Sequence, residues 1–182
     1  MEWNPLLLEQ LTWHWDHHVR RRLEGLSDDE YLWEPAAGMW SLRRRDDART
    51  AMAAGAGEWV LDYEHPAPEP DPPTTIAWRL AHVVIVFGER CANHFGGPPM
   101  SYQSVDWPPT AAGALNVLEE CYERWVTGVR SLGEDGLGRA VGAAEGPFAE
   151  YPYAALVLHI HREAIHHLAE VAVLRDLYAH RV

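Results

Sequence analysis

Apolar residues recur at helical spacing in four long stretches of this chain, and loops rich in proline and glycine separate these stretches. The four stretches span roughly residues 5–24, 75–95, 111–132 and 152–180. No segment shows the alternation of apolar and polar residues that a half-buried strand requires. The pattern therefore predicts an all-α fold, a four-helix bundle with long loops and short extra helices, formed by residues 1–182 as a single domain.

Capping residues predict where several helices begin. Asn4, followed by proline, predicts the start of the first helix, and a capping-box sequence at Ser27 predicts a short helix after it. Thr74 or Thr75 precedes the next long helix, and Thr110 precedes the third. These signals are independent of the apolar periodicity, so they support the same helical reading.

The acidic composition excludes two classes of partner. The chain has 15 basic and 27 acidic residues, a formal net charge of −12. Nucleic acids and anionic lipid surfaces attract basic proteins, so we expect neither a nucleic acid nor a membrane as partner.

The sequence contains no apolar run of about 18 residues, the length of a transmembrane helix. The first residues lack the basic start and cleavage site of a signal peptide, so we expect a cytoplasmic protein.

Several features are expected to carry no chemistry. Cys91 and Cys121 are too few for a disulfide framework, and we expect both thiols to be reduced and buried. Residues 36–73 are irregular, and the arginine triplet 43–45 within them is expected to be a solvated charge run. Five prolines in residues 65–73 predict an extended linker.

The last helix carries two polar residues on its apolar face. Glu163 and His167 are four residues apart and therefore project from one face of the helix. The same face carries the apolar residues Leu156, Ile160, Ala164, Val171, Leu174 and Tyr178. Burying a carboxylate and an imidazole is costly unless both are satisfied. A metal ion, an arginine partner or a direct Glu–His hydrogen bond would each satisfy them, and this helix alone does not decide among the three.

A third candidate ligand lies in the helix predicted over residues 75–95. His82 interrupts a nearly continuous apolar stretch, with Trp78 on its own face, while Arg79 lies off that face and is expected at the surface. A lone histidine in such a place is more commonly a satisfied core residue. Opposite the pair on the last helix, however, it completes a His–Glu–His set, and three protein ligands with an open fourth position characterise catalytic zinc sites. Nickel, iron and manganese also accept these donors.

The other histidines have less distinctive positions. His159 lies one turn before the candidate carboxylate and could line the edge of a pocket. His161 and His166 fall off the apolar face and are expected to be surface or helix-contact residues. His14 and His18 on the first helix either face the same cavity or form a polar flank. No zinc-protease HExxH motif, glycine-rich phosphate loop or nucleophile elbow is present in the sequence.

Short motifs in this order resemble the DinB/YfiT-like metal-binding four-helix bundles. They are WRLAH at residues 78–82, ExxxH at residues 163–167, and the tail at 169–178, with an opening at 11–15 similar to the actinobacterial branch. The likeness covers almost the whole chain. The commonest family form has histidine where this chain has glutamate, and a glutamate there is similar to the mycothiol-dependent maleylpyruvate isomerase branch. The Arg-Gly-Gln that often follows the last ligand is replaced here by Leu-Ala-Glu.

The resemblance implies a divalent-metal site formed by His82, Glu163 and His167, with zinc as the first expectation. Four further residues are expected to line the cofactor pocket: Trp78, His14, His18 and His159. The resemblance also implies a homodimer and a thiol-dependent transferase or isomerase. In such an enzyme the metal removes the proton of mycothiol, bacillithiol or a similar low-molecular-weight thiol, or of water in a hydrolase, and the nucleophile attacks a small-molecule substrate. The alternative is a non-catalytic bundle that binds a ligand or partner, with a structural or vestigial metal site or no metal.

Overall fold

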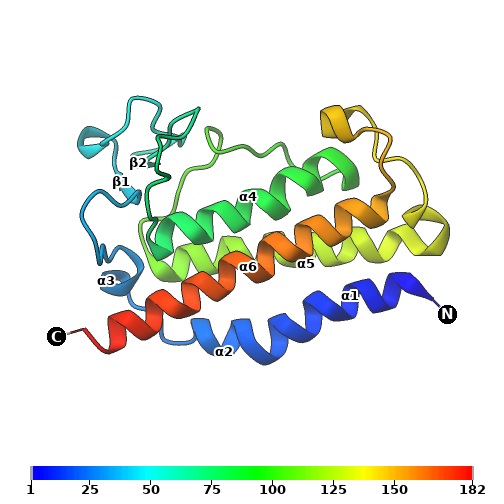
Figure 1. Cartoon of the computed structure of the whole chain (residues 1–182), viewed down its shortest axis with the longest axis horizontal. Helices are drawn as coiled ribbons and strands as arrows, with labels where there is room; N and C mark the ends of the chain where they lie inside the picture. Colours follow the sequence, from blue (N-terminus) through cyan, green and yellow to red (C-terminus); the bar gives the residue numbers. More distant parts are fainter. Residues whose placement is uncertain (1, 182) are drawn as a thin grey trace.

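The computed structural model describes residues 2–181 and shows four long helical segments packed along one another (Figure 1). The first segment is continuous and consists of α1 (Trp3–His14), a π-helical turn η1 (Trp15–Val19) and α2 (Arg20–Leu23). The other three are α4 (Ile76–Phe95), α5 (Ala111–Leu137) and α6 (Tyr153–Ala179). The predicted all-α four-helix bundle is confirmed.

The polar caps predicted from the sequence form three of the helix starts. Thr75 and Thr110 each accept a hydrogen bond from the backbone amide three residues further on, at the starts of α4 and α5. Ser27 does the same for the short helix α3 (Asp28–Tyr31). The cap predicted at Asn4 is wrong. Asn4 lies inside α1, and its buried side-chain amide donates to the Val129 carbonyl of α5 at 2.9 Å, so it joins two helices instead of starting one.

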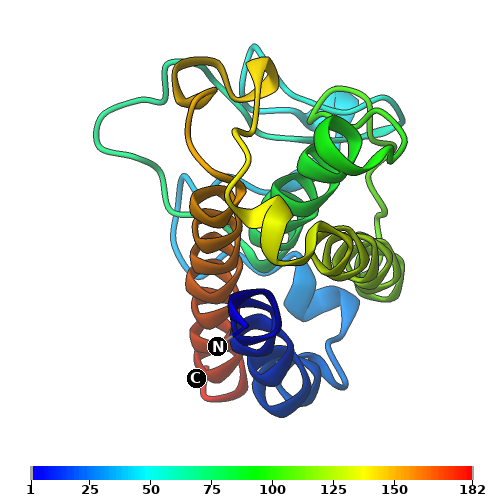
Figure 2. The ribbon, with the colours of Figure 1, turned by 90° about the vertical axis from the view of Figure 1, so that its right-hand side faces the viewer.

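The core lies where α4 packs against α5 and α6, and α1 against α5 and α6. Figure 2, which looks along the helices, shows the irregular segments gathered on the side of the bundle where α4 lies. Trp15 stacks on Tyr122 of α5 with ring centroids 3.8 Å apart.

Cys91 and Cys121 are free, buried thiols, as predicted. None of the described helices combines the length and apolar character needed to cross a membrane.

The segment between α3 and α4 contains a small antiparallel sheet that the sequence pattern did not predict. Strand β1 (Leu42–Arg44) pairs with β2 (Trp59–Leu61). The expectation of a solvated arginine triplet is wrong for Arg43, whose side chain is only 10 % exposed and forms ion pairs with Asp62 and Glu34, both at 2.7 Å. Two carboxylates take the place of water around the guanidinium, and this allows the side chain to be largely buried.

Candidate metal centre

The structure brings the three candidate ligands together between α4 and α6. His82 of α4 and Glu163 and His167 of α6 place one ligand atom each within 4.8 Å of the others. The two imidazole rings have centroids 4.5 Å apart and lie nearly perpendicular, at 89°. His167 Nε2 is 3.4 Å from Glu163 Oε2. Two helices distant in sequence therefore present two nitrogens and a carboxylate to one point.

One nitrogen of this group shows that the residues fit a cation. His82 Nε2 is buried and has no hydrogen-bond partner among the described residues, while its Nδ1 pairs with the Tyr102 hydroxyl at 2.5 Å. A buried polar atom without a partner is costly and calls for an explanation. A direct Glu163–His167 contact would leave this nitrogen unsatisfied, whereas a divalent cation would engage all three side chains. The donor set of two imidazoles and a carboxylate is one that zinc accepts.

A second layer of residues fixes the ring of His167. Glu170 Oε2 lies 2.7 Å from His167 Nδ1, and Arg79 Nε lies 3.0 Å from the same carboxylate oxygen. With Nδ1–H donating to Glu170, the lone pair of Nε2 faces Glu163, which is the arrangement typical of histidine ligands. The expectation that Arg79 lies at the surface is wrong. Its side chain is 22 % exposed, because it reaches back to Glu170 across the α4–α6 interface.

The local electrostatics keep His82 in the form that a ligand requires. Burial is the main cause that lowers the pKa of His82, and together with the neighbouring His167 and Arg79 it brings this pKa to about 3. The imidazole is therefore neutral at neutral pH, with a lone pair free to bind a metal. Glu163 supplies the negative charge of the ligand set.

Aromatic side chains from α4 and from the segments before and after it lie beside His82. Trp78 lies against the ring of His82, with centroids 5.7 Å apart and planes 10° apart, and its indole donates to the Asp62 carbonyl at 2.9 Å. Trp40 packs on Trp78, with ring centroids 6.0 Å apart. Tyr102 comes from the loop between α4 and α5. The irregular segment before α4 and the loop after it therefore form a wall beside the metal-ligand group.

The remaining predicted histidines take different positions. His159 is exposed, with its Nδ1 3.7 Å from Glu163 Oε1, so it lies at the edge of the group. His14 and His18 lie 5.5 Å apart, between ring centroids, on the segment formed by α1 and η1. That segment packs on α5 and α6, and the structure does not bring these two histidines to the metal-ligand group. His161 is fully buried, so it is a helix-contact residue and not a surface one.

A second set of potential ligands shares His167 but fits a metal less well. His166, His167 and Glu170 also place ligand atoms within 4.8 Å of one another. However, the side chain of His166 is 64 % exposed, and Glu170 is already paired with Arg79 and with His167 Nδ1. The first set is preferred because its buried nitrogen has no other partner.

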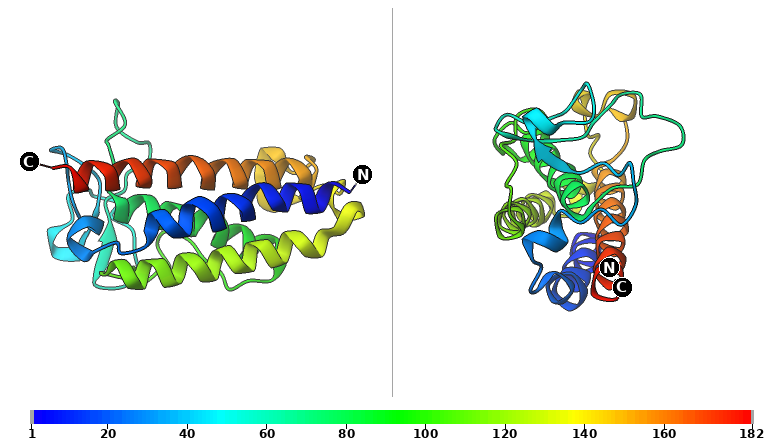
Figure 3. Two further views of the ribbon diagram at one scale, coloured as in Figure 1. Left: turned by 90° about the horizontal axis from the view of Figure 1, so that it is seen from below. Right: turned by 90° about the vertical axis from the view of Figure 1, so that its left-hand side faces the viewer.

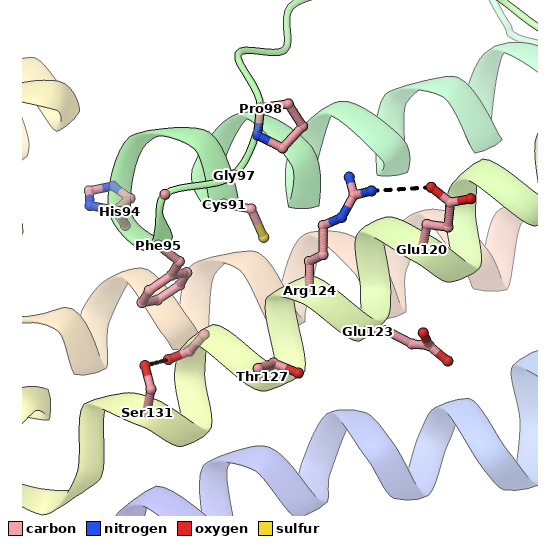
Figure 4. Close-up of a pocket in the computed structure, with 12 residues that line it drawn as sticks. Cys91, His94, Phe95, Gly97, Pro98, Glu120, Glu123, Arg124, Thr127 and Ser131 are labelled. Carbon is pink, nitrogen blue, oxygen red and sulfur yellow. Dashed lines mark hydrogen bonds and ion pairs between the residues drawn. The ribbon is translucent and has the colours of Figure 1, made fainter.

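A groove on the other side of α4 does not contribute to this site. It has a volume of about 740 Å³ and lies between α4 and α5, with Arg124 and Glu120 paired on its α5 side (Figure 4). Cys91 lines it, and burial raises the pKa of this thiol to about 12. The thiol is therefore protonated at neutral pH and is not a nucleophile.

Comparison with known proteins assigns the family. The family model described as the DinB superfamily matches residues 48–171, a region that holds all three candidate ligands. The chain belongs to the DinB superfamily. Searches of curated proteins and of solved structures found no significant match.

Proposed function

We propose that this chain is a divalent-metal-dependent enzyme of the DinB superfamily, with His82, Glu163 and His167 as the ligands and zinc as the metal expected first. The nucleophile is a low-molecular-weight thiol such as mycothiol, or water, in a transferase, isomerase or hydrolase reaction on a small molecule. The observation that carries the proposal is the meeting of three ligand atoms within 4.8 Å, one of which, His82 Nε2, is buried without a partner.

Side chains of this chain set the charge of the metal-ligand group, hold the two imidazole rings in position and shield His82 from solvent. A divalent cation bound there would lower the pKa of a thiol or water in its open position. Glu163 reduces the charge of the set, while Tyr102 and Glu170 hold the two imidazoles in place. Trp78 shields His82 from solvent on one side. The buried Cys91 thiol stays protonated, which supports a nucleophile supplied from outside the chain.

The first experiment is elemental analysis of protein purified without a histidine tag. We expect about one equivalent of a transition metal per chain after reconstitution, and its loss in His82→Ala and Glu163→Ala. His166→Ala is the matched control, because it removes a neighbouring exposed imidazole that belongs only to the second set of potential ligands. Less than about a tenth of an equivalent in the reconstituted wild type would refute the proposal. Loss in the control alone would assign the metal to the second set.

The alternative, a non-catalytic bundle with a structural metal, makes a different prediction. Structural zinc sites have four protein ligands, whereas the group between α4 and α6 offers three. Cobalt-substituted protein mixed with a low-molecular-weight thiol should therefore gain a near-ultraviolet thiolate-to-cobalt absorption band. An unchanged spectrum at saturating thiol would favour the structural alternative, or water as the nucleophile.

The proposal also covers the cellular compartment and the oligomeric state of the protein. We propose that it acts in the cytoplasm, where reducing conditions suit the free thiols of Cys91 and Cys121. We further propose that it acts as a homodimer.

A further inference from the structure

A second cavity lies next to the metal-ligand group. It has a volume of about 400 Å³ and is lined by residues of α4, of α6 and of the loop between α5 and α6. Because α4 and α6 run in opposite directions (Figure 1), residues after His82 and residues before Glu163 lie toward the same end of the bundle. Arg90 lines the cavity two turns after His82, so the cavity centre is on the order of 10 Å from the ligands. Cavities of this size bind small organic molecules.

His159 connects the cavity to the metal-ligand group. It lines the cavity and lies one turn before Glu163, with its Nδ1 3.7 Å from Glu163 Oε1. His159 therefore borders a molecule bound in the cavity and also lies beside Glu163, one of the candidate metal ligands.

Two aromatic rings form one wall of this cavity. Phe148 and Tyr151 are 58 % and 55 % exposed, and their rings stack with centroids 5.6 Å apart. Backbone hydrogen bonds fix the loop that carries them: the Tyr151 amide donates to the Phe148 carbonyl, and the Val141 amide donates to the Tyr151 carbonyl. Large apolar side chains held in an exposed position mark a surface that binds an apolar partner or ligand. The rings are therefore arranged to receive a planar apolar group.

Two arginines provide positive charge in the same cavity. Arg90 Nε is buried and lies 3.0 Å from Glu145 Oε1, but at an angle too bent for a hydrogen bond, so this donor has no acceptor. Arg162 is exposed, and its Nη2 donates to His159 Nδ1 at 2.9 Å, a partner that is not a carboxylate. Arg90 is also paired with Glu89 through Nη1 at 2.7 Å, so among the described residues that line the cavity it is Arg162 whose positive charge has no carboxylate partner, and this charge favours an anionic ligand.

Among the described residues that line the cavity, Glu145 alone has a carboxylate, and this carboxylate is already engaged. Glu145 Oε1 lies 2.8 Å from His94 Nε2 and 3.0 Å from Arg90 Nε, and its side chain is almost fully buried. His94 is in turn 3.2 Å from the Tyr153 hydroxyl. Glu145 therefore holds Arg90 in place and balances its charge, while Arg162 remains available for a ligand.

We propose that this cavity binds an aromatic carboxylate, with its ring against Phe148 and Tyr151 and its carboxylate at Arg162. A planar guanidinium matches a carboxylate in shape, and the apolar wall disfavours a strongly hydrated dianion such as a phosphate monoester. This inference rests on the proposed function for the role of the ligand, which is the small-molecule substrate. The binding itself needs no metal.

Calorimetric titration of the full, metal-free chain tests this inference, with 2-naphthoate and its neutral analogue 2-naphthamide as probes. We expect the acid to bind at least about tenfold more tightly than the amide, because hydrogen bonds to charged groups exceed those to neutral ones. Arg162→Gln should weaken binding of the acid about tenfold and leave that of the amide unchanged. Phe148→Ala should weaken both. Arg124→Gln, in the separate groove between α4 and α5, is the matched control and should change neither.

The outcomes separate this inference from the proposed function. Equal affinity for acid and amide, or an unchanged affinity for the acid in Arg162→Gln, would overturn the inference even if the protein binds its metal. Arg162 is exposed and its substitution leaves the Arg90–Glu145 pair intact, so misfolding would not obscure this result. Selective binding of the acid by the wild type, together with less than about a tenth of an equivalent of metal in that reconstituted wild type, would support the cavity and contradict the proposed function.

Discussion

At the scale of single residues, Tyr102 orients a candidate ligand without touching the metal position. Its hydroxyl contacts His82 Nδ1 at 2.5 Å. Removing such an orienting partner typically lowers metal affinity 10- to 100-fold, so Tyr102→Phe should show a loss of about that size in competition with a chromophoric chelator. Tyr63→Phe is the control, because Tyr63 packs on Tyr102 with ring centroids 5.3 Å apart and its hydroxyl makes no contact with His82. Equal affinities in the two variants would contradict the assigned role.

Two buried histidines outside the metal-ligand group should respond in opposite ways to the same substitution. His161 is fully buried with neither ring nitrogen hydrogen-bonded, whereas both nitrogens of the buried His94 have partners, Tyr153 and Glu145. An unsatisfied buried polar group costs roughly 1–3 kcal/mol. In urea unfolding, His161→Leu should therefore raise the free energy of unfolding by about 1 kcal/mol or more, and His94→Leu should lower it by roughly 2 kcal/mol. Equal destabilisation by both substitutions would contradict this account.

The sequence distinguished some of these residues and not others. Glu163 and His167 could be predicted as a pair because their spacing places them on an apolar helical face, and His82 because it interrupts one. Tyr102 could not, since it comes from a loop whose path depends on tertiary contacts such as the hydrogen bond from the Trp107 indole to the Ala54 carbonyl. Helical spacing also does not show whether a buried histidine such as His161 finds a partner.

At the scale of elements, the segment carrying β1 and β2 depends on a cluster of charges that acid should weaken. Glu34 pairs with Arg43 and Arg49. The hydrogen bond from Arg43 lowers the pKa of Glu34 below its usual 4.5, burial opposes this, and Arg49 adds to the lowering. The stabilisation is therefore present above the pKa of the unfolded chain, near 4.5, and is lost as the pH falls through the lower pKa of the folded chain.

This cluster leads to a pH-dependent prediction. Between about pH 7 and about pH 3, the free energy of unfolding of the wild type should fall more than that of Glu34→Gln, measured by denaturant titration at each pH. Glu58→Gln is the control, because Glu58 forms an exposed pair with Arg44 that contributes little. The control should follow the wild type. Parallel curves for Glu34→Gln and the wild type would show that Glu34 is not the acid-sensitive group.

The elements differ in how far the sequence determines them. The long helices could be predicted because apolar spacing and caps such as Thr75 and Thr110 agree with each other. The strands could not, because each has only three residues, too few for an alternating pattern, and they pair across a long connection through residues such as Leu42 and Leu61. The ion pairs of Arg43 form between residues far apart in the sequence, so a charge run alone does not show that one of its members is buried.

At the scale of the whole molecule, the two candidate binding regions share the α4–α6 interface. The metal-ligand group lies at the first half of α4, and the cavity lies at its second half, where the loop before α6 covers it. The side of the bundle formed by α1 carries none of the candidate ligands and none of the residues that line the cavity. Assembly through that side would therefore leave the candidate site accessible.

The side of the bundle formed by α1 and α6 is where we expect a homodimer to form. These helices lie side by side (Figure 3) and keep six large apolar side chains exposed: Trp3, Leu6, Trp13, Leu158, Val173 and Leu177. Light scattering should give the mass of two 20.6 kDa chains. Trp13→Glu combined with Val173→Glu should give a monomer with unchanged circular dichroism, because a charge at each position would oppose burial. Met52→Glu, exposed but in the segment between α3 and α4, should remain a dimer. A monomeric wild type at all concentrations would exclude the dimer, and a dimeric double variant would place its interface elsewhere.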